Sequence, residues 1–249
     1  MPDTQHPVTQ HTASHSMPVI TDLNGRHDMY GLVHKALRMA QCDMLVRLGS
    51  FDFVHGDVAG LIDELRGLLT LGRGHIAHEE AHIHTALEGL APGGTLVLAE
   101  QHGSHRAQFA ALDALLGKLE VAEAGNRAAI GRRLYLSYTR FVAEDFEHML
   151  EEETVTQPHL WALFDDNALR GIEHAIVSSI PPEKSILFLR LMIPAANRDE
   201  RVQLLTGMKL HAPKEAFIAV LENAARPTLS ADDMADLERR LALIQVVPN

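Results

Sequence analysis

The chain has 249 residues and a formal net charge of −11, from 33 acidic and 22 basic residues. This balance argues against a nucleic-acid partner bound through its phosphates. No run of about eighteen uncharged apolar residues and no secretory leader is present, so we expect a cytoplasmic protein that does not enter a membrane. Cys42 is the single cysteine and cannot form an internal disulfide, whereas 16 histidines are an unusual number.

Residues 1–20 are polar and show no apolar period, so we expect a disordered tail whose histidines are not ligands. A helix is predicted from about residue 22 to residue 48, because its apolar residues recur every three to four positions. His34 lies in the middle of this helix. Taken alone, a histidine in such a stripe is more often an ordinary core residue than a metal ligand.

A second helix is predicted over about 57–87 and contains the segment His75-Ile-Ala-His-Glu79-Glu-Ala-His82. An α-helix turns about 100° per residue, so His75, Glu79 and His82 lie on one stripe. Leucines occupy the same face in the preceding turns, which places this stripe in the core. An unpaired imidazole or carboxylate in a core costs several kcal/mol, so we expect these groups to have partners.

Two more helices are predicted over about 95–120 and 127–154, each after a turn that contains glycine. Short loops would join all four helices, which predicts an all-α fold with an up-down-up-down four-helix bundle over residues 21–156. Neighbouring helices of such a bundle are antiparallel. The histidines of the four helices then fall near one end of the bundle.

The last of these helices repeats the His-x-x-x-Glu spacing at His148 and Glu152, again on an inward face. One such pair alone is usually a hydrogen bond between neighbouring turns. Two copies on inward faces, with further histidines on the other helices, instead favour a metal site. Imidazole and carboxylate suit iron, manganese or zinc, and a carboxylate can bridge two ions. No thiolate accompanies them, so we expect a dinuclear site with nitrogen and oxygen ligands.

This order of residues resembles the hemerythrin-like, or HHE cation-binding, family over roughly residues 22–156. The family pattern is a histidine on the first helix, His-x-x-x-Glu on the second, a histidine on the third and His-x-x-x-Glu on the fourth. The resemblance implies a non-haem site with two iron ions, bridged by Glu79 and Glu152, with histidines as terminal ligands. The ligands implied by the resemblance are His34, His75, Glu79, His105, His148 and Glu152.

The third helix departs from the pattern of the oxygen-carrying hemerythrins, which have two histidines four positions apart. The residue four positions before His105 is Gln101. Either His102 or His82 supplies the additional nitrogen, or one ion keeps a water molecule or an open position. Glu144 is either an acceptor for an imidazole N–H group or a surface carboxylate.

Residues 157–249 are predicted to form an additional region of shorter helices, because prolines interrupt the apolar pattern. Their apolar residues need a partner, which is either the bundle or a second subunit of a homodimer. No catalytic motif is found in this region.

The resemblance implies a protein that binds or activates dioxygen, peroxide or nitric oxide at its metal site. The appended helices could shape a pocket for a small organic substrate, which favours an oxidase or oxygenase. One alternative is an iron-binding protein that senses oxygen or nitric oxide, or donates iron, without turnover. Another is a structural protein whose histidines are merely paired core residues.

Overall fold

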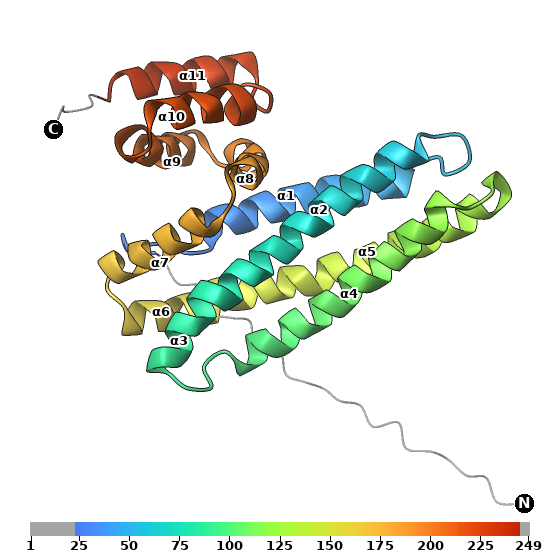
Figure 1. The fold of residues 1–249 in the computed structure, drawn as a ribbon, viewed down its shortest axis with the longest axis horizontal. Helices are drawn as coiled ribbons and strands as arrows, with labels where there is room; N and C mark the ends of the chain where they lie inside the picture. The colour runs from blue at the N-terminus through green and yellow to red at the C-terminus, as the bar shows by residue number, and fades with distance from the viewer. Residues whose placement is uncertain (1–22, 245–249) are drawn as a thin grey trace, which may run out of the picture.

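The computed structural model describes residues 23–244, and these residues form helices and no strand (Figure 1). The prediction of an all-α fold is thereby confirmed. The predicted disordered tail, residues 1–20, lies outside the described residues. Among residues 23–244, no helix has the length and hydropathy that spanning a bilayer requires.

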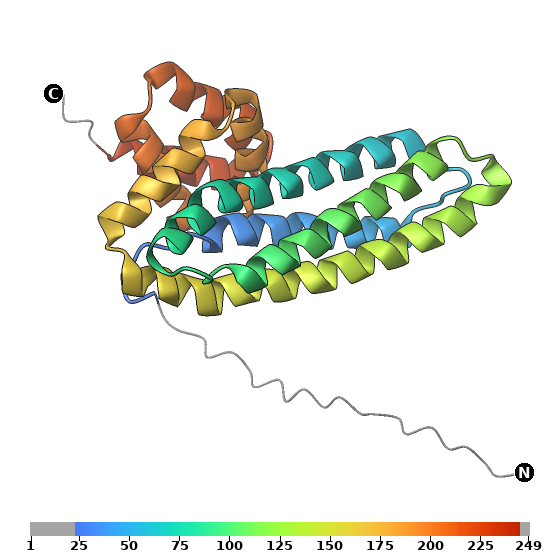
Figure 2. The same ribbon diagram turned by 60° about the horizontal axis from the view of Figure 1, so that its bottom comes forward.

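Four long helices lie side by side and are joined at alternate ends, so neighbours along the chain are antiparallel (Figures 1 and 2). The second and the fourth continue through short π-helical segments into further α-helix. The elements are α1 (Gly31–Ser50), α2 (Val58–His78), η1 (Glu79–His84), α3 (Thr85–Leu90), α4 (Leu96–Glu120), α5 (Ala124–Glu151), η2 (Glu152–Thr156) and α6 (Gln157–Leu163). Helix α1 packs against α2 and α5, and α4 packs against the same two helices.

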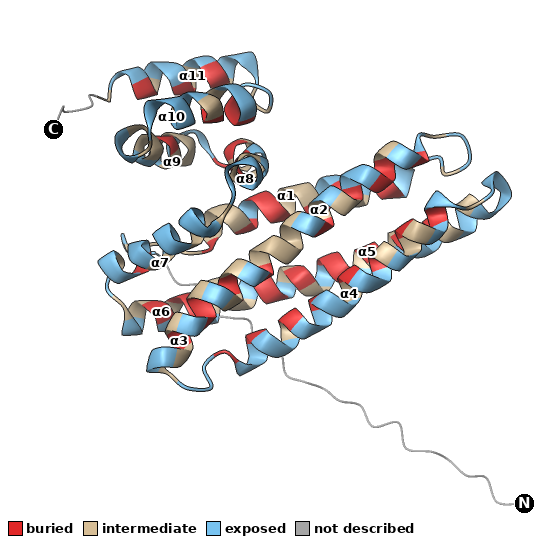
Figure 3. Cartoon of the chain, viewed as in Figure 1, coloured by how far each residue is buried: buried red, intermediate tan, exposed pale blue. Residues whose placement is uncertain are grey.

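The faces that these helices turn toward one another are apolar and buried, while their outer faces are exposed (Figure 3). Leucines spaced three or four residues apart on α2, including Leu61, Leu65 and Leu69, are almost completely buried. Leu112 and Leu116 of α4 belong to the same core cluster. Burying a leucine side chain stabilises the fold by roughly 2 kcal/mol, so this stripe fixes which face of each helix points inward.

Helix α5 continues further than the sequence predicts. We expected the fourth helix to end near residue 154, before Pro158, but the helical path runs through η2 and α6 to Leu163. Pro158 lies in the first turn of α6, directly after the π-helical segment, where the proline ring is tolerated. The predicted boundary at residue 156 therefore falls inside a continuous helical path.

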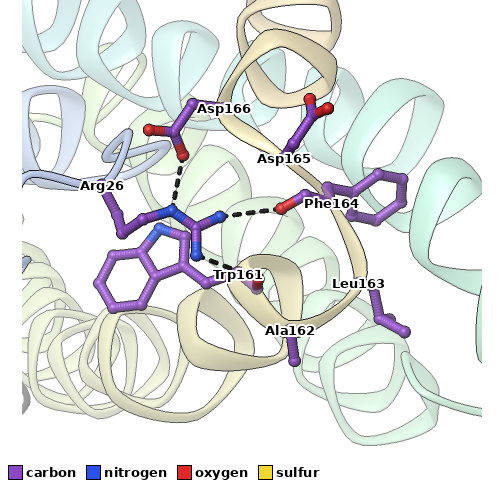
Figure 4. A pocket seen from close by; sticks show the side chains of 7 residues that line it. All are labelled: Arg26, Trp161, Ala162, Leu163, Phe164, Asp165 and Asp166. Carbon is purple, nitrogen blue, oxygen red and sulfur yellow. Dashed lines mark hydrogen bonds and ion pairs between the residues drawn. The ribbon is translucent and has the colours of Figure 1, made fainter.

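The segment that leads into α1 is tied to the start of the C-terminal region. The guanidinium of Arg26 donates to Oδ1 of Asp166 over 2.7 Å and to the carbonyl oxygens of Trp161 and Phe164 over 3.1 and 2.8 Å (Figure 4). These groups line a hollow at the surface of the molecule. The indole N–H of Trp161 also donates to the carbonyl of His27 over 2.8 Å.

The remaining elements are α7 (Asp166–Ser179), α8 (Pro182–Ala195), α9 (Arg198–His211), α10 (Lys214–Val220), η3 (Leu221–Ala225) and α11 (Ala231–Ala242). Helix α7 packs against η1, whereas α8 and the elements after it build a second core on the outer side of α1, against which α8 packs (Figure 1). Ile193, Leu205 and Leu237 lie in this second core. One helix that we expected over 161–179 is interrupted, because Asp165 caps the start of α7 by accepting from the N–H of Ala168.

Candidate metal centre

Six imidazole and carboxylate side chains from the four long helices meet near one end of the helix assembly. They form two overlapping groups, in each of which the nitrogen and oxygen atoms lie within 4.8 Å of one another. We call these six residues the His–Glu cluster. The first group is His34, His75, Glu79 and Glu152, and the second is Glu79, His102, His148 and Glu152.

The two glutamates are shared by both groups, and local helix geometry places them there. Glu79 and Glu152 each begin a π-helical segment, one turn after His75 and His148 respectively. A π-helical turn holds an additional residue and therefore changes the direction of the side chains that follow it. Such segments occur frequently at functional sites.

In the first group, the Nε2 atoms of both histidines face carboxylate oxygens. Nε2 of His75 lies 3.0 Å from Oε1 of Glu79. Nε2 of His34 lies 3.7 Å from the same oxygen and 3.4 Å from Oε2 of Glu152. Both carboxylates thus approach this pair of imidazoles with one oxygen each.

The second group repeats this arrangement with the other pair of histidines. Nε2 of His102 lies 3.6 Å from Oε2 of Glu79, and Nε2 of His148 lies 3.4 Å from Oε2 of Glu152. The two Nε2 atoms are 3.0 Å apart. Glu79 therefore turns one oxygen toward each pair of histidines.

Three of the imidazoles are oriented by oxygen atoms on the side away from the cluster. Nδ1 of His34 lies 2.9 Å from Oε1 of Glu153, and Nδ1 of His102 lies 3.2 Å from Oε1 of Glu80. Nδ1 of His148 lies 2.8 Å from the amide oxygen of Gln101. With these oxygens as acceptors, each Nδ1 is the donor, so in the neutral form of each imidazole Nε2 presents its lone pair to the cluster.

Several polar atoms of the cluster are buried and have no hydrogen-bond partner among residues 23–244. They include both oxygens of Glu79, both oxygens of Glu152, and Nε2 of His34 and of His75. Unpaired buried carboxylates are costly, and two facing lone pairs on His102 and His148 repel each other. A cation between these atoms would satisfy all of them, so the donor set fits a metal ion and offers both imidazole and carboxylate ligands.

Burial shifts the pKa values of several residues in the His–Glu cluster far from their ordinary values. Burial, together with the charge of Glu152, raises the pKa of Glu79 to about 8. Burial lowers the pKa of His148 to about 2 and, with the neighbouring His84, lowers that of His102 to about 4. Without a metal ion these two imidazoles are held neutral and the Glu79 carboxylate is driven toward protonation. A bound cation reverses this preference for the carboxylate. Burial also lowers the pKa of His34, but hydrogen bonds with the neighbouring carboxylates, Glu152 first, raise it well above its ordinary value.

Two of the residues proposed from the sequence lie outside both groups. Nδ1 of His105 is 3.5 Å from Oδ1 of Asp145, and its ring packs against Phe141 and against the ring of His148. The position that we expected for His105 is occupied by His102, which lies one turn nearer to the end of α4 where the other ligands meet. His82 is partly exposed on η1 and belongs to neither group.

Sequence reasoning missed the residues that orient the imidazoles. Glu80 and Glu153 each follow a glutamate of the cluster directly, so both motifs have the form His-x-x-x-Glu-Glu. This doubled glutamate was a signal that could have been used. Glu144, which we considered as an acceptor for an imidazole, instead binds Gln108 and Arg140.

No family model, curated protein or solved structure matches this chain. What the site can do is therefore argued from its own atoms.

Proposed function

We propose that this protein belongs to the hemerythrin-like family, that its four long helices form the up-down-up-down bundle of that family, and that the His–Glu cluster holds two iron ions. We propose further that it binds dioxygen or another small diatomic molecule, such as nitric oxide, at this centre. One observation carries the proposal. Four carboxylate oxygens and two imidazole nitrogens are buried at one point, and none of them has a hydrogen-bond partner among the described residues.

The division into two groups supports one arrangement of ligands. His34 and His75 would hold one ion, and His102 and His148 the other, with Glu79 and Glu152 shared between the ions. Imidazole and carboxylate also suit manganese and zinc; zinc has no redox chemistry, so binding dioxygen with electron transfer would require iron or manganese. Bound iron would supply the electrons and the position at which a diatomic ligand binds.

The chain's own residues hold and enclose the centre. Glu153, Glu80 and Gln101 keep the Nδ1 protons in place and thereby direct three Nε2 lone pairs inward. A small apolar cluster, which includes Ile83 and Leu160, also contains Tyr30, whose ring stacks on His34. These apolar side chains exclude water, which strengthens electrostatic interactions with a bound ligand.

The enclosure favours a small ligand. Glu79 and Glu152 are 2% and 0% exposed, and His34 and His102 are both 0% exposed. The hollow beside Arg26 and Trp161 is lined by none of the six residues of the cluster. A diatomic molecule needs only transient openings between side chains, whereas an organic substrate needs a cavity that reaches the ligands.

The test is the metal content of protein purified without a His-tag, together with its absorption spectrum in air and after anaerobic reduction. We expect two iron ions per chain and near-ultraviolet charge-transfer bands that change when dioxygen or nitric oxide is added. Glu79→Ala and Glu152→Ala should each lose most of the metal, because each glutamate is shared by both groups. His174→Ala, which removes an exposed histidine from α7, is the control and should keep it.

Less than one metal ion per chain, unchanged in both glutamate variants, would refute the metal site. The histidines would then be structural residues of the core. Two iron ions whose spectrum responds to neither gas would instead indicate iron binding or donation without a gaseous ligand.

A further inference from the structure

Tyr30 lies immediately before α1, one turn from His34, and contacts the His–Glu cluster. Its side chain is 1% exposed. Its ring stacks on the imidazole of His34, with 5.2 Å between the ring centroids and 29° between the planes. Its hydroxyl oxygen is buried and has no hydrogen-bond partner within the part of the chain that the structure describes.

An unpartnered hydroxyl is unexpected at such a position. Phenylalanine would give the same stacking and the same apolar contacts without burying an unsatisfied polar group. The other fully buried tyrosine, Tyr138, has a carbonyl oxygen of Gln41 at 3.5 Å from its hydroxyl. The hydroxyl of Tyr30 therefore has the properties of a donor whose acceptor is not among residues 23–244.

The backbone that carries Tyr30 is fixed from both sides. Oδ1 of Asp28 accepts from the N–H groups of Tyr30 and Gly31 over 3.1 and 2.9 Å. The N–H of Met29 donates to the side-chain oxygen of Gln157 over 2.8 Å. Arg26 is bound to α6, α7 and the turn between them, as Figure 4 shows. The position of the phenol is thus preorganised and does not depend on a bound ligand.

We propose that the Tyr30 hydroxyl donates a hydrogen bond to a small anionic ligand bound at the His–Glu cluster, and that it thereby selects ligands with an exposed acceptor atom. This inference rests on the proposed function. It assigns Tyr30 a role in ligand binding and specificity, not in holding the metal.

The experiment compares the full chain, loaded with iron, with its Tyr30→Phe variant, using azide as the anionic probe. Azide binding is followed by its charge-transfer absorption, and iron per chain is measured in parallel. We expect Tyr30→Phe to keep the wild-type iron content and to bind azide about tenfold more weakly or worse, because a hydrogen bond to an anion is lost. Tyr138→Phe, the same change at the other fully buried tyrosine, should bind azide as the wild type does.

Equal azide affinity in Tyr30→Phe and the wild type overturns the inference. A loss of iron in Tyr30→Phe also overturns it, because the phenol would then be a metal ligand rather than a donor to the anion. Both outcomes differ from a failure of the proposed function, in which the wild-type chain itself holds less than one metal ion. Thermal unfolding is measured as a check on the fold. We expect the midpoint temperature of the metal-free variant to be no lower than that of the metal-free wild type.

Discussion

Replacing Glu79 by glutamine should stabilise the metal-free protein and abolish its metal binding at the same time. Burial and the charge of Glu152 raise the pKa of Glu79 from 4.5 to about 8. The folded chain therefore binds this proton more tightly than the unfolded chain does. Between pH 4.5 and pH 8 the wild-type protein without metal loses stability as the pH rises, by about 1.4 kcal/mol per pH unit.

The loss in free energy of unfolding grows with the number of pH units by which the solution lies above the ordinary pKa of Glu79. At pH 7 the raised pKa of Glu79 lowers the free energy of unfolding of the metal-free protein by roughly 3 kcal/mol, and at pH 5 by under about 1 kcal/mol. Glutamine has almost the same shape and does not ionise. Metal-free Glu79→Gln should therefore exceed the metal-free wild type in free energy of unfolding by roughly 3 kcal/mol at pH 7 and by much less at pH 5.

The assay is urea unfolding of chelator-treated protein at both pH values. Glu147→Gln changes an exposed glutamate on α5 and should alter stability by less than about 0.5 kcal/mol at either pH. After iron is added, the order should invert, because only the wild type gains binding energy in its folded state. A stability difference that is the same at pH 5 and pH 7, or a more stable wild type at pH 7, would show that Glu79 is already satisfied without metal.

The remaining predictions concern the division of the cluster, its outer partners and the core. His75→Ala and His148→Ala each remove a ligand from one group only, so elemental analysis should find about half of the wild-type iron in each. Glu153→Ala removes the carboxylate that orients the imidazole of His34. It should weaken iron binding roughly ten- to a hundredfold in a competition with a chelator. Gly131→Ala places a methyl group against the partly buried ring of Phe53 and should lower the free energy of urea unfolding by about 1–3 kcal/mol without changing iron content.

Spacing along the helices was sufficient to predict four of the six residues of the cluster. His75 with Glu79, and His148 with Glu152, are one turn apart, so each pair shares a face whatever the helix packs against. The choice between His102 and His105 is different. Both point inward from α4 and differ by one turn in depth, and only the relative heights of the helices decide which one meets the others.

The π-helical segments are a second feature that pattern reasoning could not supply. A regular period of 3.6 residues places His82 on the stripe of Glu79, but η1 begins at Glu79 and rotates the residues that follow it. The continuation of α5 into α6 was missed for a related reason. Pro158 normally marks the end of a helix, and its tolerated position depends on η2 just before it.

The hydrogen bonds of Arg26 join residues that lie between 135 and 140 positions apart in the chain. During synthesis from the N-terminus, the segment before α1 lacks these distant partners until residues 157–166 have left the ribosome. The four long helices can collapse before that moment, because their contacts close shorter loops at a lower entropic cost. The end that carries the histidines is thus completed last, and the emergence of α6 and α7 sets the time at which it closes.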